Sequence, residues 1–406
     1  MHWRAIIRLF GLLLMFYSLS FLPSLIVSWI YSDGQWITFI GSSLIVFLLG
    51  LSLWLSNYHQ RQELSVRDGF LVVTLFWFIL GLVGALPFYL SLHLGFTDAV
   101  FESISGFTTT GATVIVGLDQ LPQSILYHRQ QIQWLGGMGI IVLAVAILPL
   151  LGVGGMQLYR AETSGVAKNE KMTPRIAETA RSLWLIYLLL TVCCALAYWF
   201  AGMSFFDAVG HAFTTVATGG FSTHDDSIGY FNSPLIEAIA IVFMLAGGVN
   251  FAVHFLVLRR KLISSYAEDP EVRTFGLLFV FASIFIAISL YFAGVYSGGW
   301  EALRYAAFQV ASIMTSTGFG TAVFAEWPLH IPLILVILSF IGGCAGSTAG
   351  GIKVMRIMLL AKLGLRQLEL LVHPRSVAVV KLGNGQYLKQ YCFRFGVFMC
   401  FILSQH

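Results

Sequence analysis

One segment occurs three times in this chain, and it restricts the fold more than any other feature. DAVFESISGFTTTGAT at Asp98–Thr113 returns without a gap as DAVGHAFTTVATGGFS at Asp207–Ser222, and a looser copy, AAFQVASIMTSTGFG, occupies Ala306–Gly320. Each copy lies between two apolar runs and ends in a cluster of Thr, Ser and Gly. Non-helical backbone exists at membrane depth only where it is packed in protein or lines a water-filled cavity. The three clusters are therefore predicted to surround one aqueous axis.

The composition places the chain in a membrane. Hydrophobic residues make up 58% of it, charged residues only 10%, and the mean hydropathy is +0.83. A soluble domain carries roughly 25% charged residues. The predicted fold is an all-α polytopic membrane protein with repeated helix–pore loop–helix units around a central ion pore. The five cysteines lack metal-ligand spacing and are interpreted as packing residues: Cys193, Cys194, Cys344, Cys392 and Cys400.

A membrane-spanning helix needs about 20 apolar residues. The expected spans are Ala5–Trp29, Trp36–Leu55, Gly69–Leu92, Gln133–Leu151, Leu183–Ala201, Leu235–Leu258, Phe275–Tyr296 and an interrupted one at Ile331–Ala361. The N-terminal residues MHWRAIIRLF show no signal-peptide cleavage pattern, so the first run is interpreted as a membrane helix.

Basic residues gather in every second connecting segment, and the segments between them hold only Arg129 and Arg304. This alternation follows the positive-inside rule and predicts a cytoplasmic N-terminus. It works only if each repeated segment enters the membrane and returns to the side it came from. A full span at those positions would invert every later loop.

These patterns divide the chain into five parts. Residues 1–60 are expected to form two leading transmembrane helices. Residues 61–160, 161–262 and 263–365 are expected to form three pore units, the third with a broken second helix. Residues 366–406 are expected to hold a cytoplasmic loop and the incomplete first helix of a fourth unit.

The segments expected outside the cell are acidic. They hold Asp33, Asp98, Glu102, Asp119, Asp207, Asp225, Asp226, Glu237, Glu301 and Glu326. Ten acids against two bases give that face a net charge of 2 − 10 = −8. A negative mouth would raise the local cation concentration. The same pattern also arises when ordinary surface acids remain after the bases are sorted inward.

Three triplets are the candidate lining of the ion path. They are Thr109-Thr110-Gly111, Thr218-Gly219-Gly220 and Ser316-Thr317-Gly318. A dehydrated cation needs oxygen ligands, which backbone carbonyls and Thr hydroxyls supply. The triplets contain no carboxylate, so a monovalent ion is favoured. The preceding half-helices would point their negative ends at the ion. The alternative is a cluster of small residues that merely lets helices pack closely.

A glycine-rich break, GGCAGSTAGG, occupies Gly342–Gly351 inside the last long apolar run. Broken helices at membrane depth mark binding sites or gates in transport proteins. The segment is predicted to lie beneath the triplets and to obstruct the path, with close packing as the alternative. The residues assigned to this gate are Gly342, Gly343, Gly346, Ser347, Thr348, Gly350 and Gly351. GSTAGGIK does not fit the phosphate loop, because Ile352 separates the second glycine from Lys353.

One histidine falls inside an expected span. His254 follows Gly247-Gly248 and Asn250, and an intramembrane histidine is a functional candidate by default. Its position near the cytoplasmic end of Leu235–Leu258 predicts that it faces the membrane interface.

These residues together resemble the TrkH subfamily of the Trk/Ktr/HKT potassium transporter superfamily. The resemblance rests on FTTTGAT at Phe107, LGGMGIIVLAVAILPLLGVGGMQLYRAE at Leu135, RIAETA at Arg175, GGFSTHD at Gly219 and IGGCAGSTAGG at Ile341. It implies four pore units around one K⁺ path, a key glycine at Gly111, Gly220 and Gly318, and a gate at Gly342–Gly351. It also implies a homodimer in the bacterial inner membrane, regulated by TrkA, a cytosolic nucleotide-binding ring. No nucleic acid partner and no cofactor on this chain are expected.

The fourth unit of the resembled family has no counterpart among the residues up to His406. The last apolar run, Cys392–Leu403, would reach only about 18 Å as a helix, against a hydrocarbon core of roughly 30 Å. We therefore expect a truncated chain that does not conduct selectively by itself. Robust growth of a potassium-uptake-deficient host on low potassium would contradict this expectation.

Three function classes remain beside a potassium uptake path. A proton- or sodium-coupled secondary transporter would need ionisable residues in mid-span, and the sequence has almost none there. A membrane enzyme would need a cluster of His, Asp or Ser at one depth, and no such cluster is seen. A non-conducting fragment is the third alternative. The sequence does not fix the permeability ratio of K⁺ to Na⁺, the gating stimulus or coupling to another ion.

Overall fold

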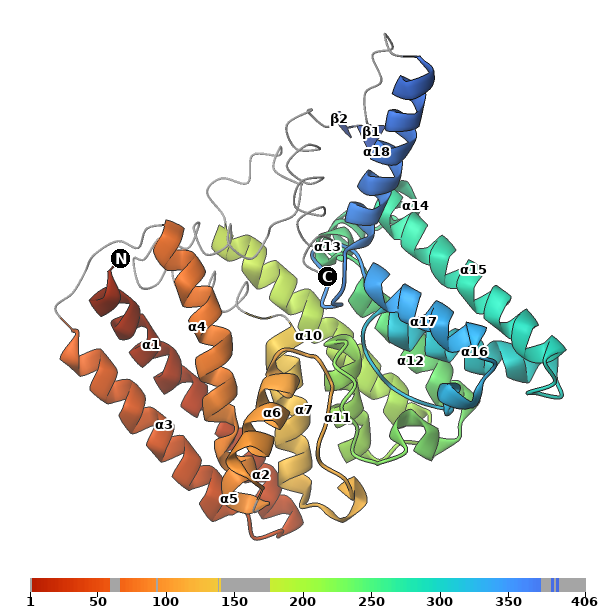
Figure 1. Cartoon of the computed structure of the whole chain (residues 1–406). Helices are drawn as coiled ribbons and strands as arrows, with labels where there is room; N and C mark the ends of the chain where they lie inside the picture. Colours follow the sequence, from red (N-terminus) through yellow and green to blue (C-terminus); the bar gives the residue numbers. More distant parts are fainter. Residues whose placement is uncertain are drawn as a thin grey trace.

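A computed structural model gives the fold for residues 2–58, 66–92, 94–137, 139, 176–373, 381–382 and 385–386. The first group of helices comprises α1 (Trp3–Ser18), α2 (Phe21–Tyr31), α3 (Trp36–Ser56), α4 (Val66–Gly84), α5 (Leu86–Ser91), α6 (Phe96–Phe107), η1 (Leu118–Gln120) and α7 (Gln123–Gly137). Figure 1 shows these elements on one side of the molecule, with α6 and α7 nearest its middle.

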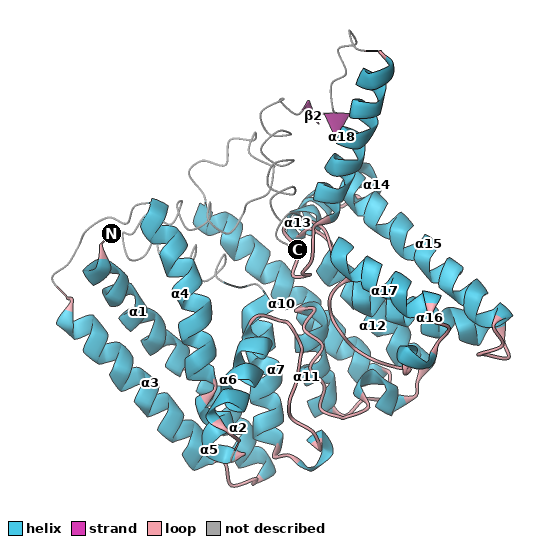
Figure 2. Ribbon diagram, viewed as in Figure 1, coloured by secondary structure: helices cyan, strands magenta, loops and turns pink. Residues whose placement is uncertain are grey.

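The other side of the molecule is also helical (Figure 2). It comprises α10 (Ile176–Phe200), α11 (Phe205–Val216), η3 (Ser227–Phe231), α12 (Pro234–Gly248), α13 (Phe251–Arg260), α14 (Ser264–Glu268), α15 (Pro270–Phe292), α16 (Gly299–Met314), η4 (Phe324–Glu326), α17 (His330–Ile341) and α18 (Val354–Val372). Two short antiparallel strands follow, β1 (Lys381–Leu382) and β2 (Gly385–Gln386).

Five helical stretches in the described chain are long and apolar enough to cross a membrane. They are Trp3–Tyr31, Trp36–Ser56, Thr74–Ser91, Arg181–Phe200 and Pro270–Phe292. Each overlaps an expected span, so the all-α membrane fold is confirmed. The interruption of Ile331–Ala361 is confirmed as well, because α17 ends at Ile341 and α18 begins at Val354. Beyond α7, the expected span Gln133–Leu151 lies almost wholly outside the described residues, as does the run Cys392–Leu403.

The expected span at Leu235–Leu258 corresponds to two helices, which together are long and apolar enough to cross a membrane but are separated by a break. α12 and α13 meet at a bend of 99°. Val249 is extended between them, and the Asn250 side chain caps α13 by accepting the amide of Ala252 at 2.9 Å. The carbonyl of Gly346, from the glycine-rich break, accepts the amide of Phe251 at 3.1 Å. Capping groups that satisfy the new helix end make the break stable.

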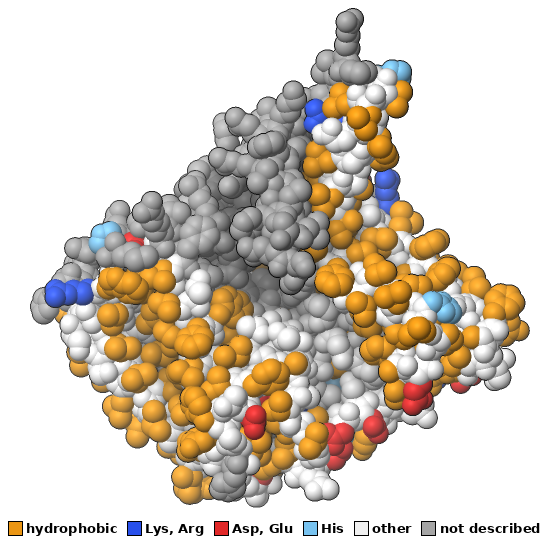
Figure 3. All heavy atoms as spheres, viewed as in Figure 1, with side chains coloured by type: hydrophobic (Ala, Val, Ile, Leu, Met, Phe, Trp, Pro, Cys, Tyr) orange, Lys and Arg blue, Asp and Glu red, His pale blue; other side chains and the backbone are white. Residues whose placement is uncertain are grey.

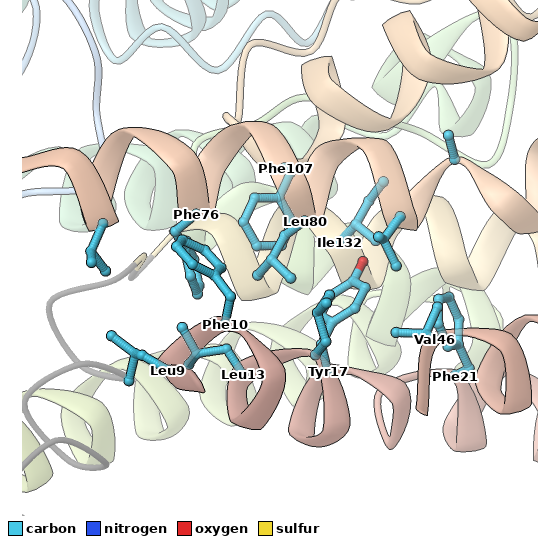
Figure 4. Close-up of a cluster of buried hydrophobic side chains, with 14 of the residues drawn as sticks. Leu9, Phe10, Leu13, Tyr17, Phe21, Val46, Phe76, Leu80, Phe107 and Ile132 are labelled. Carbon is cyan, nitrogen blue, oxygen red and sulfur yellow. The ribbon is translucent and has the colours of Figure 1, made fainter. Parts of the chain in front are cut away.

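The core on the N-terminal side fixes the end of the first repeated helix. Phe107, the last residue of α6, is buried among side chains of α1, α2 and α4, including Tyr17, Phe76 and Leu80 (Figure 4). Its ring meets those of Tyr17 and Phe76 at centroid distances of 6.1 Å and 6.0 Å. Aromatic pairs of this kind add to dispersion and hold the rings in one arrangement. The chain therefore enters its first triplet from a rigid anchor.

The outer surface suits a lipid environment. Large apolar side chains cover the flanks of the molecule, while acidic side chains gather at one end of the visible face and basic ones at the other (Figure 3). Phe281 and Phe285 of α15, for example, expose 72% and 47% of their surface. Continuous exposed apolar surface of this extent marks a membrane or partner contact in a folded protein.

Candidate ion-binding site

The three repeated helices end in the same way, directly before their triplets. α6, α11 and α16 stop at Phe107, Val216 and Met314. In each copy, the amide of the triplet's middle residue donates to a carbonyl five residues earlier: Thr110 N to Ser105 O at 2.9 Å, Gly219 N to Thr214 O at 2.9 Å and Thr317 N to Ser312 O at 2.8 Å. The shared bond folds the chain back under each helix end. The third copy, the least similar in sequence, thus adopts the same local structure as the others.

The backbone of each triplet is strained in the same places. The first residues have positive φ although they are not glycine: 55° at Thr109, 52° at Thr218 and 56° at Ser316. The third residues also have positive φ: 77° at Gly111, 81° at Gly220 and 85° at Gly318. A left-handed residue with a Cβ costs about 1–2 kcal/mol. Such strain persists where the surroundings impose it, and it clusters at functional sites.

The triplets meet one another through their backbones. A Cβ added to Gly111 would overlap the carbonyl oxygen of Gly219 and lie 3.5 Å from that of Thr317. A Cβ added to Gly220 would overlap the Thr317 oxygen, far inside the 3.0 Å that real Cβ atoms respect. The structure therefore brings together all three predicted segments, which are far apart in the sequence.

The triplet carbonyls are largely free of protein hydrogen bonds. Of the nine, only that of Gly219 accepts one from a described residue, the Gln133 amide at 2.8 Å. Buried carbonyl groups are normally paired, because an unpaired one costs desolvation energy. Together with the carbonyl ends of the three helices, these oxygens form the candidate site for a dehydrated cation.

A set of polar side chains, which sequence reasoning missed, ties each repeated helix to the loop segment after its triplet. Glu102, His211 and Gln309 occupy the same position in the three copies, and all are buried. Glu102 accepts from Thr113 Oγ1 and from the Val114 amide at 3.1 Å. The His211 ring bonds to Ser222 Oγ at 2.9 Å, and Gln309 donates to Ala322 O at 3.1 Å. An alignment of the three copies could have revealed this set, because a polar residue recurs at one position of all three helices.

Two residues assigned to the acidic outer face are therefore buried instead. The carboxylate of Glu102 pairs with the Arg129 guanidinium at 2.5 Å, and their side chains are 0% and 1% exposed. Arg129 also donates to Ser222 O at 2.9 Å and lies 3.8 Å from the Phe221 ring centroid. Glu237 pairs with Arg304 through two contacts of 2.6 Å. Arg129 and Arg304 thus form ion pairs within the fold. Their partners, Glu102 and Glu237, do not add to a negative potential at the surface.

Gln133 of α7 braces the second triplet from behind. Its Nε2 donates to the Gly219 carbonyl at 2.8 Å, and its Oε1 accepts the Phe221 amide at 3.0 Å. Gln130, one turn earlier, is equally buried, but its amide atoms have no hydrogen-bond partner among the described residues.

We expect Gln133→Leu to destabilise the protein by about 1–3 kcal/mol, because it leaves a buried carbonyl and a buried amide unpaired. Gln130→Leu removes no hydrogen bond seen in this structure and is expected to be neutral or stabilising. Thermal unfolding of both variants measures the difference. Equal losses of stability would contradict the bracing role of Gln133.

The glycine-rich break lies against the base of the triplets. Thr348 Oγ1 is 3.2 Å from Thr218 Oγ1 and donates to Val216 O at 3.0 Å. The Gly350 amide donates to Ser316 Oγ at 2.6 Å. The residues Gly342, Gly343, Gly346, Ser347 and Gly351 lie in the same turn-rich segment between α17 and α18. The segment Gly342–Gly351, here named the gate loop, therefore contacts two of the three triplets.

His254 is buried within the protein, so its side chain does not face outward to the membrane interface as expected. It is 6% exposed, with Nδ1 2.7 Å from Tyr266 Oη and Nε2 2.9 Å from the Ala246 carbonyl. The same carbonyl also accepts the Val249 amide at 3.2 Å, so the ring adds a second hydrogen bond at the end of α12. The bend was not foreseen, and the burial of His254 follows from it.

An ion-pair network joins the outer loops of the first two copies. His224 bonds to the carboxylate of Asp119 and lies 3.5 Å from that of Asp207, while its ring stacks on Tyr230 at a centroid distance of 3.5 Å. Partial burial lowers the pKa of His224, but the two carboxylates outweigh this effect and raise it above its ordinary value. The bond from His224 in turn lowers the pKa of Asp119.

Stability from this network is expected to depend on pH. A histidine with a raised pKa contributes fully below its unfolded pKa, and the contribution is lost as pH rises through its folded pKa. The lowered pKa of Asp119 adds a contribution that is lost when pH falls through the acid range. Melting temperatures of the parent and of His224→Gln should differ most near about pH 5 and converge by about pH 9. A difference that does not change with pH would contradict the ion pair.

The fold and its converging pore segments define a multi-span membrane transport protein and not an enzyme. A family model for TrkH, described as a cation transport protein, matches residues 37–404. The chain belongs to the TrkH family. This confirms the resemblance drawn from the motifs at Phe107, Leu135, Arg175, Gly219 and Ile341.

Relatives of known name support the assignment. The chain is 54% identical over 387 residues to the Trk system potassium uptake protein TrkH of Escherichia coli (strain K12), covering 95% of this chain and 80% of that protein. It is 40% identical to the TrkG protein of the same strain, covering 94% and 79%. The crystal structure of the potassium transporter TrkH from Vibrio parahaemolyticus matches with a TM-score of 0.88 and 47% identity, covering 98% of this chain and 83% of that one.

Proposed function

We propose that this chain supplies three pore segments of a potassium uptake path across the bacterial inner membrane, with its N-terminus in the cytoplasm. The observation that carries the proposal is the convergence of three strained triplets whose carbonyls are almost all unpaired within the described structure. Thr109, Thr110, Gly111, Thr218, Gly219, Gly220, Ser316, Thr317 and Gly318 supply the oxygen ligands and the close approach. K⁺ is the transported ion, and the chain itself needs no cofactor.

The gate loop controls the path in this proposal. Its contacts with Thr218, Val216 and Ser316 support this role, because they hold a segment of small residues against two of the proposed ion-binding triplets. Displacing it would open a route toward the opposite end of the molecule. A cytosolic TrkA-type ring that binds nucleotide, acting on a homodimer of this chain in the lipid bilayer, is the proposed source of that displacement.

Two buried carboxylates argue against a coupled secondary transporter, which is the second candidate. Such a transporter relays protons through buried ionisable groups that change partners. The buried carboxylates of Glu102 and Glu237 instead hold fixed pairs with Arg129 and Arg304. The first pair also contacts the segment after the second triplet, because Arg129 donates to Ser222 O.

Selective ion binding tests the proposal without requiring conduction. A ligand that binds only the folded state stabilises it by about 2.7 kcal/mol at a hundred times its dissociation constant. The purified protein is therefore expected to melt at a higher temperature in KCl or RbCl than in NaCl at equal ionic strength. Equal melting temperatures in the three salts would overturn the proposed filter.

A further inference from the structure

One buried carboxylate has no part in the ion path described above. Glu271 lies in the first turn of α15 and is only 2% exposed. Its Oε1 accepts two backbone amides, from Ala345 at 2.8 Å and from Met355 at 2.9 Å. Ala345 belongs to the gate loop, and Met355 is the second residue of α18. A single oxygen of α15 thus joins the beginning of the gate loop to the helix that follows it.

The gate loop is attached both to the triplets and to α15. On one side, the gate loop is bonded to the base of the triplets through Thr348 and Gly350. On the other side, it is bonded to Glu271. A hydrogen bond to an ionised group is worth more than a neutral one, so the bond to the carboxylate contributes more than any single neutral bond of the gate loop. Neutral bonds also join the loop to the end of α12, where Gly248 O accepts the Cys344 amide at 2.8 Å and Gly247 O accepts the Thr348 amide at 3.3 Å.

The position of Glu271 is itself fixed. Asp269 caps α15 by accepting the amides of Glu271 and Val272 at 2.9 Å and 3.0 Å. One turn further along α15, Phe275 packs in a buried cluster with Cys344 of the gate loop and Val354 of α18. α15 therefore contacts the gate loop at two positions. Glu271 accepts a hydrogen bond from it, and Phe275 packs against it.

From this geometry we propose that Glu271 is the positioning residue that holds the gate loop against the triplets. The inference rests on the proposed function and adds the attachment by which the loop is kept in place. α15 follows the segment formed by α13, α14 and Asp269, which carries Arg259, Arg260 and Lys261. Displacement of that segment would move the carboxylate and release the gate loop.

Cys344 reports release of the gate loop without any engineered label. The thiol is 0% exposed in this structure and neighbours Ala345 in the chain. Glu271→Gln removes the charge that strengthens both hydrogen bonds. We expect the modification rate of Cys344 by a water-soluble maleimide, measured by peptide mass mapping, to rise by about tenfold or more in this variant. Glu326→Gln, at an exposed site in η4 and outside the segment that would move Glu271, is the matched control and should leave the rate unchanged.

Thermal stability in KCl and in NaCl shows whether Glu271 positions the gate loop or supports the whole fold. The extra thermal stability in KCl over NaCl should persist in Glu271→Gln, because the triplets keep their own bonds. If the stability difference disappears together with Cys344 protection, Glu271 supports the whole fold and the inference is overturned. An unchanged Cys344 rate also overturns it. Glu271→Asp, which keeps the charge but is one methylene shorter, gives the same comparison if the glutamine variant does not fold.

The two proposals fail in different ways. A parent protein that shows no stability difference between KCl and NaCl rejects the proposed filter. Cys344 reactivity still decides the role of Glu271 in that case, since it depends on the gate loop and not on ion binding.

Discussion

Gly220→Ala is expected to abolish potassium-specific stabilisation of the protein. Two effects add at this position. The added methyl group meets the Thr317 carbonyl oxygen, and the backbone has a φ of +81°, which a residue with a Cβ adopts only at a cost. The neighbouring triplet would have to move away from the axis, so the oxygens could no longer surround one ion. Melting temperatures in KCl and NaCl measure the loss.

Gly34→Ala is the matched control for this prediction. Gly34 has a φ of +77°, but an added Cβ meets nothing within 4 Å. This variant carries the same backbone strain, about 1–2 kcal/mol, without the clash. It should melt slightly lower than the parent in both salts and keep the difference between them. If Gly220→Ala also keeps that difference, close approach of the second and third triplets is not required for ion binding.

Arg129→Met is expected to give a large loss of stability, about 3–5 kcal/mol, because it leaves the Glu102 carboxylate charged and buried. The variant also removes the bond to Ser222 O and the contact with the Phe221 ring, which follow the second triplet directly. Chemical or thermal unfolding in detergent measures the loss, and the yield of monodisperse protein should fall with it.

The double variant Glu102→Gln with Arg129→Met shows whether the unpaired charge is the cause. A neutral side chain at position 102 can still accept from Thr113 and the Val114 amide. The double variant should therefore regain much of the stability that Arg129→Met loses. If it is no more stable than Arg129→Met, the arginine acts through its other contacts and the charge argument is wrong.

The repeated elements could be predicted from sequence, because they are local. Each triplet follows a helix that ends at a Thr, Ser or Gly cluster, and the same signal occurs three times. The break at Gly342–Gly351 was equally visible as a run of small residues within an apolar stretch. Such patterns need no knowledge of neighbouring segments.

The remaining features depend on contacts between distant segments. Leu235–Leu258 is a continuous apolar run, and it bends only because the Gly346 carbonyl and the Asn250 side chain satisfy the new helix end. Glu102 looked like a surface acid because Arg129, its partner, lies on another helix. The role of Gln133 depends on α7 passing behind the second triplet. Pairing of this kind is not encoded in the spacing of residues along one segment.

The central claim is that three triplets, far apart in the sequence, bind one dehydrated monovalent cation. Crystals of the protein grown in RbCl test it most directly, through the anomalous scattering of the bound ion. The account predicts an Rb⁺ peak on the axis between Gly111, Gly220 and Gly318, and the peak should vanish in Gly220→Ala. Ordered crystals with no Rb⁺ between the three glycines would contradict the account.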